Sequence, residues 1–340
     1  MSNANDLQDT IAKLSAKGKG ILAADESSPT IAKRFKAIDV ESTEENRRAY
    51  RSLLVTTPGA NEFISGIIFF EETLGQKTDD GTPIPEACAA AGIVPGIKVD
   101  KGTLALVNAP GDKITQGLDG LPERLAQYRD QGARFTKWRN VYNIGPHNPT
   151  PLAVEANAEV LARYAALAQE AGLVPIVEPE VLMDGDHDVQ RCAEVTEAVQ
   201  RAVFAALARY GVSLELMVLK PNMIVPGKEQ PKLSPEEVAE HTVRVLKRTV
   251  PAAVPTINFL SGGQTPEEAT ANLNAMNALP GALPWELSFS YGRALQEPAQ
   301  KAWRGDTANV KAAQDAFHLR AKLNAAARSG NYSAQMESAA

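Results

Sequence analysis

Lys220 is the residue of this 340-residue sequence whose position most strongly suggests chemistry, because it ends an apolar run, LELMVLKPN, at residues 214–222. Side chains alternate along a strand, so every second residue from Leu214 to Lys220 is predicted on one face, and the amine ends an apolar row. Pro221 then ends the strand. An amine withdrawn from water favours its neutral, nucleophilic form. A strand-end lysine paired with a carboxylate is the alternative, and the rest of the chain must decide between the two.

Further charged side chains lie at the ends of other apolar runs. Alternation places Lys137 with Arg139 on one face of a strand, and Glu178 with Glu180 on one face of another. Separately solvated residues would instead scatter onto both faces and both strand ends. If the strands share one mouth, the polar groups that converge there are Asp25, Lys98, Lys137, Arg139, Glu178, Glu180, Lys220, Ser261 and Arg293.

Two glycine-containing turns near this set are suited to binding phosphate. LSGGQTPEE, residues 260–268, is a flexible turn that leads into a helix with Pro266 near its start, so free backbone N–H groups can face an anion. In YGRAL, residues 291–295, Arg293 supplies a fork of donors beside Gly292. Either turn alone is a weak signal, but the pair predicts a phosphorylated substrate.

The elements that would position these groups follow a strand-helix rhythm. Eight apolar runs begin near residues 21, 63, 93, 135, 173, 214, 254 and 285, with helical segments between them. This α/β pattern predicts a single (β/α)8 TIM barrel over residues 1–340, whose catalytic residues lie at the carboxyl ends of the strands. A doubly wound sheet is the alternative fold, but no GxGxxG or Walker-type loop follows the first strand.

Local signals add detail to this barrel. Extra helices are predicted at the N-terminus, residues 5–17, and at the C-terminus, residues 293–303 and 308–328, before a mobile tail, residues 329–340. Ser42 with Glu45 fits a capping box for a helix over residues 43–55. Residues 108–120 are predicted to be an irregular excursion.

Composition excludes several classes of protein. The chain is 44% hydrophobic and 22% charged, with a net charge of -6, so no overall basic field indicates nucleic-acid binding. Two cysteines are too few for a disulfide scaffold. The N-terminus lacks an apolar signal core, and no run of about 18 apolar residues could span a membrane. A soluble cytoplasmic protein is predicted.

The motif DGDHD, residues 184–188, could be mistaken for a metal-binding loop. The other histidines, His147, His241 and His318, are single and far apart in sequence, so a solvated turn is the favoured interpretation. We therefore predict no metal site and no cofactor.

Several motifs together give the chain a family resemblance over nearly its whole length. They occur in family order and at family-like spacing: GKGILAADES, TEENRR, GIKVDKG, TQGLDGLPER, KWR, PIVEPE, DGDHD, LKPNM, FLSGGQ and FSYGRALQ. The sequence resembles the class I fructose-1,6-bisphosphate aldolases. The resemblance implies reversible cleavage of fructose 1,6-bisphosphate to dihydroxyacetone phosphate and glyceraldehyde 3-phosphate, in glycolysis and gluconeogenesis, by a homotetramer.

The resemblance also implies residue roles. Lys220 would form the Schiff base and Glu178 would be the main acid/base, assisted by Asp25, Lys137 and Glu180. The C1 phosphate would be held by Ser261, Gly262, Gly263, Ser290, Gly292 and Arg293. Thr30, Arg34 and Lys98 would lie toward the C6 phosphate, and Arg47 and Arg139 would also bind substrate.

The chain departs from the family pattern at two places. Glu215-Leu216 stands where members usually have Glu-Gly, so local repacking without loss of chemistry is expected. The chain ends GNYSAQMESAA, without the C-terminal tyrosine that assists proton transfer at the enamine in many eukaryotic members.

Two other functions compete with the aldolase. A non-catalytic phosphosugar-binding or scaffolding protein would lack at least one of Lys220, Glu178 and Asp25, and all three are present. A transaldolase-like Schiff-base enzyme is the alternative among enzymes, but two phosphate-binding ends argue against it. The preference between fructose 1,6-bisphosphate and fructose 1-phosphate is left open.

Overall fold

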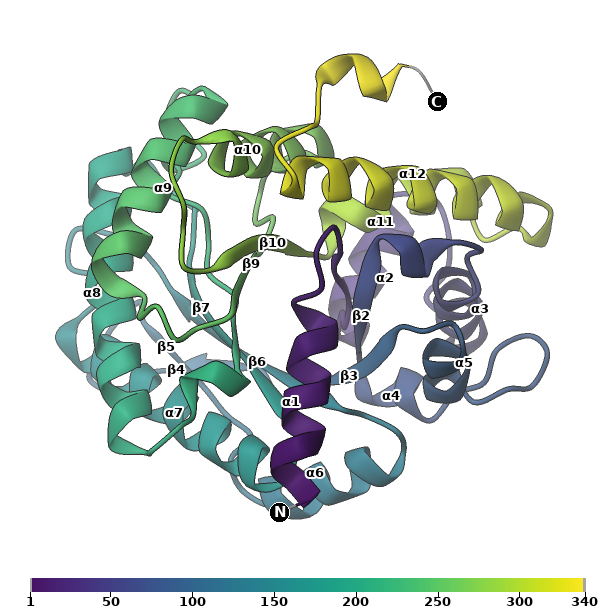
Figure 1. The fold of residues 1–340 in the computed structure, drawn as a ribbon, viewed down its shortest axis with the longest axis horizontal. Coiled ribbons are helices and arrows are strands. Elements are labelled where there is room, and N and C mark those ends of the chain that lie inside the picture. The colour runs from purple at the N-terminus through teal and green to yellow at the C-terminus, as the bar shows by residue number, and fades with distance from the viewer. Residues whose placement is uncertain (1, 339–340) are drawn as a thin grey trace.

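Eight parallel strands close into a barrel in the computed structural model, which describes residues 2–338 (Figure 1). Going round the barrel, each strand pairs with the next in chain order, and the last pairs with the first. The predicted (β/α)8 barrel is therefore confirmed. The barrel strands are β1 (Gly20–Ala24), β2 (Ile64–Phe69), β3 (Val94–Lys98), β6 (Phe135–Tyr142), β7 (Val174–Val181), β8 (Val218–Leu219), β9 (Thr256–Phe259) and β10 (Glu286–Tyr291).

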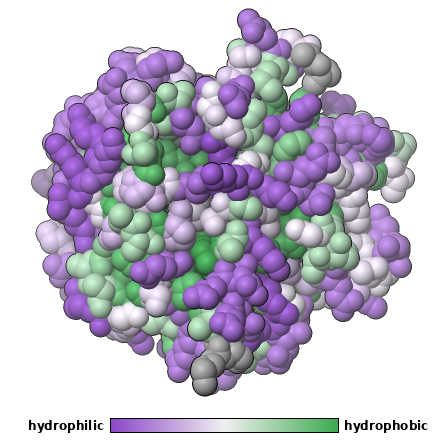
Figure 2. All heavy atoms as spheres, in the orientation of Figure 1, coloured by the Kyte–Doolittle hydropathy of each residue, from purple (hydrophilic) through white to green (hydrophobic). Residues whose placement is uncertain are grey.

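Helices surround the barrel, and the extra helices predicted at both ends of the chain are present. The helices are α1 (Ser2–Leu14), α2 (Ser28–Lys36), α3 (Glu44–Val55), α4 (Glu71–Leu74), α5 (Ile84–Ala90), α6 (Leu121–Asp130), α7 (Pro151–Glu170), α8 (Val189–Arg209), α9 (Pro235–Thr249), α10 (Pro266–Ala278), α11 (Arg293–Trp303) and α12 (Val310–Arg328). Figure 2 shows hydrophilic residues spread over the outer helices of this face, with hydrophobic atoms visible mainly between helices. No helix within residues 2–338 is both long and apolar enough to cross a bilayer.

The barrel interior is apolar toward the amino ends of its strands. There Ile21, Val94, Phe135, Ile176 and Val218 form one buried cluster with Leu7, Ile11 and Leu14 of α1. Figure 1 shows α1 lying across this end of the barrel. The spacing of these three α1 residues is helical, so one face of α1 fills the opening. This arrangement closes the amino end and leaves the carboxyl end open for chemistry.

Glycines on the strands make room for the aromatic side chains of the interior. A Cβ at Gly96 would lie only 2.3 Å from Cζ of Phe135. A Cβ at Gly66 would lie 2.8 Å from Leu14 Cδ2. Both positions therefore require glycine, because a strand side chain there would displace Phe135 or α1.

The strand before Lys220 is shorter than predicted. Residues Leu214–Leu216 form a 3-10 helix, and only Val218 and Leu219 pair as a strand. The predicted alternation from Leu214 is therefore wrong, because a 3-10 helix does not place successive side chains on opposite faces. From Val218 onward the alternation holds: Val218 lies in the interior, Leu219 packs toward the helices, and the N–H of Lys220 donates to Val177 O at 2.8 Å.

Two smaller predictions also need correction. Helix α3 is capped by Thr43, whose side chain accepts from the N–H of Asn46 at 3.1 Å, so the predicted Ser42–Glu45 capping box is wrong by one residue. The predicted irregular stretch at residues 108–120 contains a strand. In it, β5 (Lys113–Thr115) pairs antiparallel with β4 (Thr103–Ala105) beyond the carboxyl end of β3.

The C-terminal segment packs beside α10 and α12. Tyr332 N–H donates to Asn274 Oδ1 at 2.9 Å, and Arg320 pairs with Glu337 at 2.6 Å within the 3-10 turn Ala334–Glu337. Mobility of this tail stays a prediction, and its last two residues, 339 and 340, lie outside the described part.

Candidate active site

Four charged side chains meet at the carboxyl end of the barrel. Lys220 Nζ lies 3.2 Å from Glu178 Oε1, and Lys137 Nζ lies 2.9 Å from both Glu178 Oε2 and Asp25 Oδ2. The contact between Lys137 and Glu178 is an ion pair that is not aligned as a hydrogen bond, whereas the one to Asp25 is aligned. Each residue comes from a different strand or strand end, so the barrel alone brings them together.

These groups line a cavity of about 560 Å³ at the barrel mouth, yet the residues themselves are almost withdrawn from water. Lys220 and Glu178 are each 3% exposed, and Lys137 is 4% exposed. Single charges this deep would be strongly unfavourable, so the two lysines and two carboxylates depend on one another. The structure thus brings together Asp25, Lys137, Glu178 and Lys220, which were predicted to converge at the barrel mouth.

Electrostatics distinguish the roles of Asp25 and Lys137. Burial by itself would raise the pKa of Asp25, but the charges of Lys137 and Lys220 and the Lys137 hydrogen bond outweigh it, so the pKa lies well below its usual range. Burial would lower the pKa of Lys137, but Asp25 and Glu178 outweigh it and the pKa is raised. Asp25 is therefore a carboxylate, and Lys137 a fixed cation, throughout the physiological range.

The outer wall of the mouth carries further predicted residues. Arg139 forms an ion pair with Glu180, and its register partner on β7 is Glu178. Lys98 Nζ lies 2.9 Å from Asp100 Oδ1. Lys98, Arg139 and Glu180 all line the cavity, as do Thr30 and Arg34 of α2. Cationic groups thus surround the four-charge centre on this side.

Ser290 and Arg293 give the part of the mouth beside α2 its anion-binding character, and a Cβ at Gly292 would lie 3.7 Å from Arg34 Nη2. Ser290 Oγ and Arg293 Nε are buried and have no hydrogen-bond partner within residues 2–338. Arg293 also begins α11, whose N-cap residue, Gly292, supplies no side-chain cap. The first N–H groups of α11 are therefore open to an anion. Ser261, Gly262, Ser290, Gly292 and Arg293 all line the mouth.

Two predicted substrate-binding residues do not line this cavity. Arg47 pairs with Glu72 at 2.5 Å and is held in place by α4 instead. Gly263 donates its N–H to Met183 Sδ at 2.9 Å, on the far side of the 260–264 turn. The start of α10 is also closed, because Thr265 and Glu268 form a capping box. The helix N-terminus in LSGGQTPEE is thus occupied by its own side chains.

Sequence analysis missed two buried carboxylates that organise the mouth. Glu26 accepts from Arg34, pairs with Arg51 at 2.6 Å, and accepts from Gln296 Nε2 at 2.7 Å. Asp100 holds Lys98. The signal available for both was a carboxylate next to an assigned residue: Glu26 follows Asp25, and Asp100 follows Lys98 by two positions.

The DGDHD motif lies outside this centre. Asp188 caps α8 by accepting from the N–H of Arg191 at 2.7 Å, and Asp184, Asp186 and Asp188 are exposed. His187 is buried, and neither of its ring nitrogens has a hydrogen-bond partner in the described chain. Among residues 2–338, no three His, Cys, Asp or Glu side chains are grouped so as to hold a metal ion.

The fold and the site define a (β/α)8-barrel protein with a buried lysine-carboxylate centre at its mouth. A model of one family, the glycolytic class I fructose-bisphosphate aldolases, matches residues 6–340. A cytosolic fructose-bisphosphate aldolase of Arabidopsis thaliana is 57% identical over 97% of this chain and 92% of its own length. A probable class 1 aldolase of Xanthomonas campestris is 56% identical over 96% of this chain and 98% of its own.

Structural comparison agrees with the sequence comparisons. Fructose-bisphosphate aldolase from Plasmodium falciparum, solved with TRAP and a small-molecule inhibitor, superposes with a TM-score of 0.96. That protein is 50% identical, and the match covers 98% of this chain and 96% of the other. The chain belongs to the class I fructose-bisphosphate aldolase family, whose members are lyases of glycolysis, so the predicted family and enzyme class are confirmed.

Proposed function

We propose that this enzyme cleaves fructose 1,6-bisphosphate reversibly through a Schiff base on Lys220. The observation that carries the proposal is the position of Lys220 Nζ, 3.2 Å from Glu178 Oε1 in a buried cluster at a mouth also lined by Lys98, Arg139 and Arg293. A bisphosphate can bind its two phosphates to cationic groups of this mouth, with the middle of its carbon chain over the lysine.

Glu178 serves the first half of the reaction. It takes a proton from Lys220, and the free amine attacks the C2 carbonyl carbon of the ketose. The attacking nitrogen then loses a second proton, and the former carbonyl oxygen gains it to give the neutral carbinolamine. Glu178 then protonates the carbinolamine hydroxyl, which leaves as water, and an iminium forms. Lys137 remains charged beside Glu178 and stabilises each anionic state of that carboxylate.

Asp25 serves carbon-carbon cleavage. As a carboxylate, it removes the proton of the C4 hydroxyl, the C3–C4 bond breaks, and its electron pair moves into the iminium to give an enamine. Glyceraldehyde 3-phosphate leaves. Protonation of the enamine at C3 and hydrolysis of the resulting iminium release dihydroxyacetone phosphate and restore Lys220.

Two sets of residues at the mouth would hold the phosphates. Ser261, Gly262, Ser290, Gly292 and Arg293 would bind the C1 phosphate, because buried donors without partners and the open start of α11 face it. Thr30, Arg34 and Lys98 would bind the C6 phosphate. Arg139 and Glu180 would position the sugar hydroxyls between them.

Relatives support two further parts of the proposal. Several are named as cytosolic or cytoplasmic isozymes, and we place this enzyme in the cytoplasm. We also propose a homotetramer, as the family resemblance implies.

A coupled cleavage assay on fructose 1,6-bisphosphate and fructose 1-phosphate, with and without EDTA, tests this function. We expect cleavage that survives EDTA, because the iminium already supplies the electron sink that a metal would provide. Loss of activity with EDTA and recovery with zinc would refute the Schiff-base mechanism. Binding of both sugars without turnover would instead support a non-catalytic phosphosugar-binding protein.

A further inference from the structure

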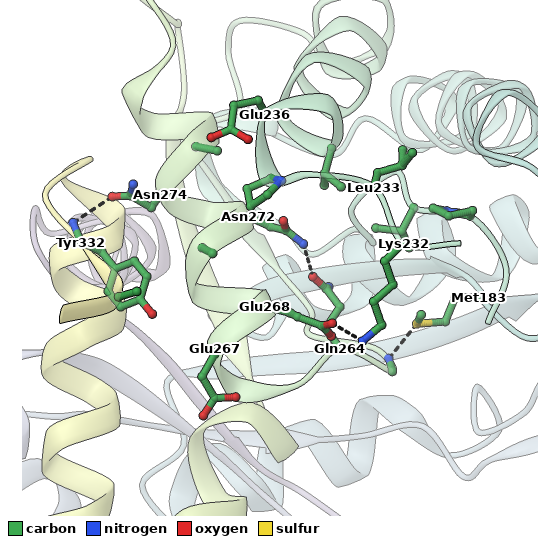
Figure 3. Close-up of a pocket in the computed structure, with 18 of the residues that line it drawn as sticks. Met183, Lys232, Leu233, Glu236, Gln264, Glu267, Glu268, Asn272, Asn274 and Tyr332 are labelled. Carbon is green, nitrogen blue, oxygen red and sulfur yellow. Dashed lines mark hydrogen bonds and ion pairs between the residues drawn. The ribbon is translucent and has the colours of Figure 1, made fainter. Parts of the chain in front are cut away.

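Met183 lies between the barrel mouth and a second cavity. It is half-buried in the loop that joins β7 to α8, and it lines a cavity of about 760 Å³ beside α9, α10 and the segment Tyr332–Ala334 (Figure 3). Its sulfur accepts a hydrogen bond from the N–H of Gly263 at 2.9 Å, drawn as a dashed line in Figure 3. This residue therefore touches the 260–264 turn from the side opposite the substrate.

The turn rests on the Met183 side chain. A Cβ at Gly263 would lie 2.6 Å from Met183 Sδ, and a Cβ at Gly262 would lie 3.6 Å from the same atom. A side chain at Gly263 would therefore displace the Met183 thioether. The contact fixes the direction of the Gly263 N–H, which points away from the mouth.

The backbone of Met183 is held in place by the loop after β8. Lys228 N–H donates to Met183 O at 2.8 Å, and Lys228 Nζ pairs with Asp184 at 2.6 Å. Gly227 N–H donates to His187 O at 2.8 Å in the same contact. These bonds hold the backbone of Met183, two residues beyond the end of β7, against the loop after β8.

We propose that Met183 is a positioning residue that sets phosphate affinity by holding the Gly263 N–H away from the mouth until phosphate binds. A thioether is a weak acceptor, so the bond satisfies this N–H in the empty enzyme and breaks readily. A phosphate oxygen is a charged acceptor that makes a stronger bond to the same N–H. The exchange is favourable, but phosphate binding breaks the hydrogen bond between Gly263 N–H and Met183 Sδ, and this cost lowers the phosphate affinity. This inference rests on the proposed C1 phosphate site and adds to it the Gly263 N–H, which does not line the mouth in the empty enzyme.

Two substitutions at residue 183 test the proposal in opposite directions. Met183→Leu keeps the apolar bulk but removes the acceptor, so the KM for fructose 1,6-bisphosphate should fall about two- to tenfold, the worth of one ordinary hydrogen bond. Met183→Gln offers a strong amide acceptor at similar length, and the KM should rise by a similar factor. The kcat should stay within about twofold of wild type in both. A merely structural role would move both KM values the same way, and that result would overturn the proposal.

Met276→Leu is the matched control. Met276 is a buried residue of α10 that packs in the core, so this change should leave the KM unaltered. A KM shift in this control as large as that in Met183→Leu would also count against a specific role for Met183.

Methionine-methyl NMR supplies a readout that does not depend on cleavage. The chain has six methionines, and the Met183 resonance is the one missing from Met183→Leu. Inorganic phosphate should move this resonance in the wild type and leave it in place in Arg293→Ala. Phosphate-dependent movement without any sugar cleavage would sink the proposed function but support this inference. Sugar cleavage with a Met183 resonance that does not move at saturating phosphate would support the proposed function but overturn this inference.

Discussion

The two ends of the barrel are built from the same strands but are stabilised by different physics. At the amino end, Ile176 and Val218 pack with α1 in an apolar cluster. Two residues further along each strand, Glu178 and Lys220 form an ion pair at the carboxyl end. Apolar burial supports the first end, and mutual neutralisation of charges supports the second. Substitutions at the amino end should therefore change stability, and substitutions at the mouth should change chemistry.

Glu178→Gln should have the largest effect on turnover. The amide keeps the shape but cannot take the proton from Lys220, so kcat should fall about 10²- to 10⁴-fold. Glu180→Gln is the matched control, since Glu180 pairs with Arg139 at the edge of the centre, and its loss should be smaller. Steady-state kinetics, with a melting curve to check folding, give the comparison. Equal losses in the two variants would show that Glu178 has no special role.

Lys137→Met should move the pH profile as well as lower activity. Lys137 lowers the pKa of Asp25, whereas burial raises it. Without Lys137, the pKa of Asp25 rises and the carboxylate is protonated at higher pH. The acid limb of the kcat/KM profile therefore moves to higher pH. Activity should also fall by about 10²-fold, since a charge that stabilises Glu178 is lost.

Lys137→Arg keeps the positive charge and provides the control for this pH shift. Its acid limb should stay close to that of the wild type, even if misplacement of the larger side chain lowers kcat. Profiles measured between about pH 4 and 9 would contradict the account if the methionine and arginine variants had the same acid limb.

Arg293→Ala removes a fork of donors from the proposed C1 phosphate site. The KM for fructose 1,6-bisphosphate should rise about 10- to 100-fold, the worth of one or two charge-assisted hydrogen bonds. Arg47→Ala is the control, because Arg47 pairs with Glu72 outside the mouth, and its KM should not change. Equal KM values in the wild type and Arg293→Ala would place the phosphate elsewhere.

Leu14→Ala, at the closed end, should have the smallest effect on catalysis. Leu14 is fully buried against the barrel interior, so its truncation should lower the free energy of unfolding by about 2–5 kcal/mol. The kcat and KM measured below the melting range should stay within about twofold of wild type. Chemical denaturation measures the predicted loss of stability, and kinetics on the same preparation measure the predicted constancy of kcat and KM. A large loss of kcat in a folded variant would mean that the two ends are coupled.

Sequence periodicity was sufficient to predict the barrel because each strand is a short apolar run bounded by turn residues. It was insufficient at Leu214–Leu216, where apolar composition predicted a strand but the chain forms a 3-10 helix. Such a run can bury its side chains in either conformation, so local pattern cannot choose between them. The β4–β5 hairpin was missed for a related reason: its strands are three residues each.

The centre of the site was more predictable than its edges. Asp25, Lys137, Glu178 and Lys220 are charged residues at the ends of buried strands, where few other arrangements would satisfy them. Arg47 and Gly263 were assigned from a motif resemblance. In the structure, Arg47 contacts Glu72 and Gly263 contacts Met183. Both partners are distant in sequence, so no pattern in the neighbouring residues could have indicated them. Contacts between loops of different strands decide such positions.

Reductive trapping tests the central claim, the nucleophilic role of Lys220, most directly. Dihydroxyacetone phosphate should condense with the Lys220 amine, and borohydride should reduce the iminium to a stable secondary amine. Mass spectrometry should find this adduct on the peptide that contains Lys220 and on neither Lys98 nor Lys137. Lys137 is kept charged by two carboxylates, Asp25 and Glu178, and Lys98 pairs with Asp100 away from the Glu178 acid/base. Lys220→Ala should lose both trapping and cleavage while remaining folded. An adduct on Lys98 or Lys137, or an active preparation without any adduct, would contradict the account.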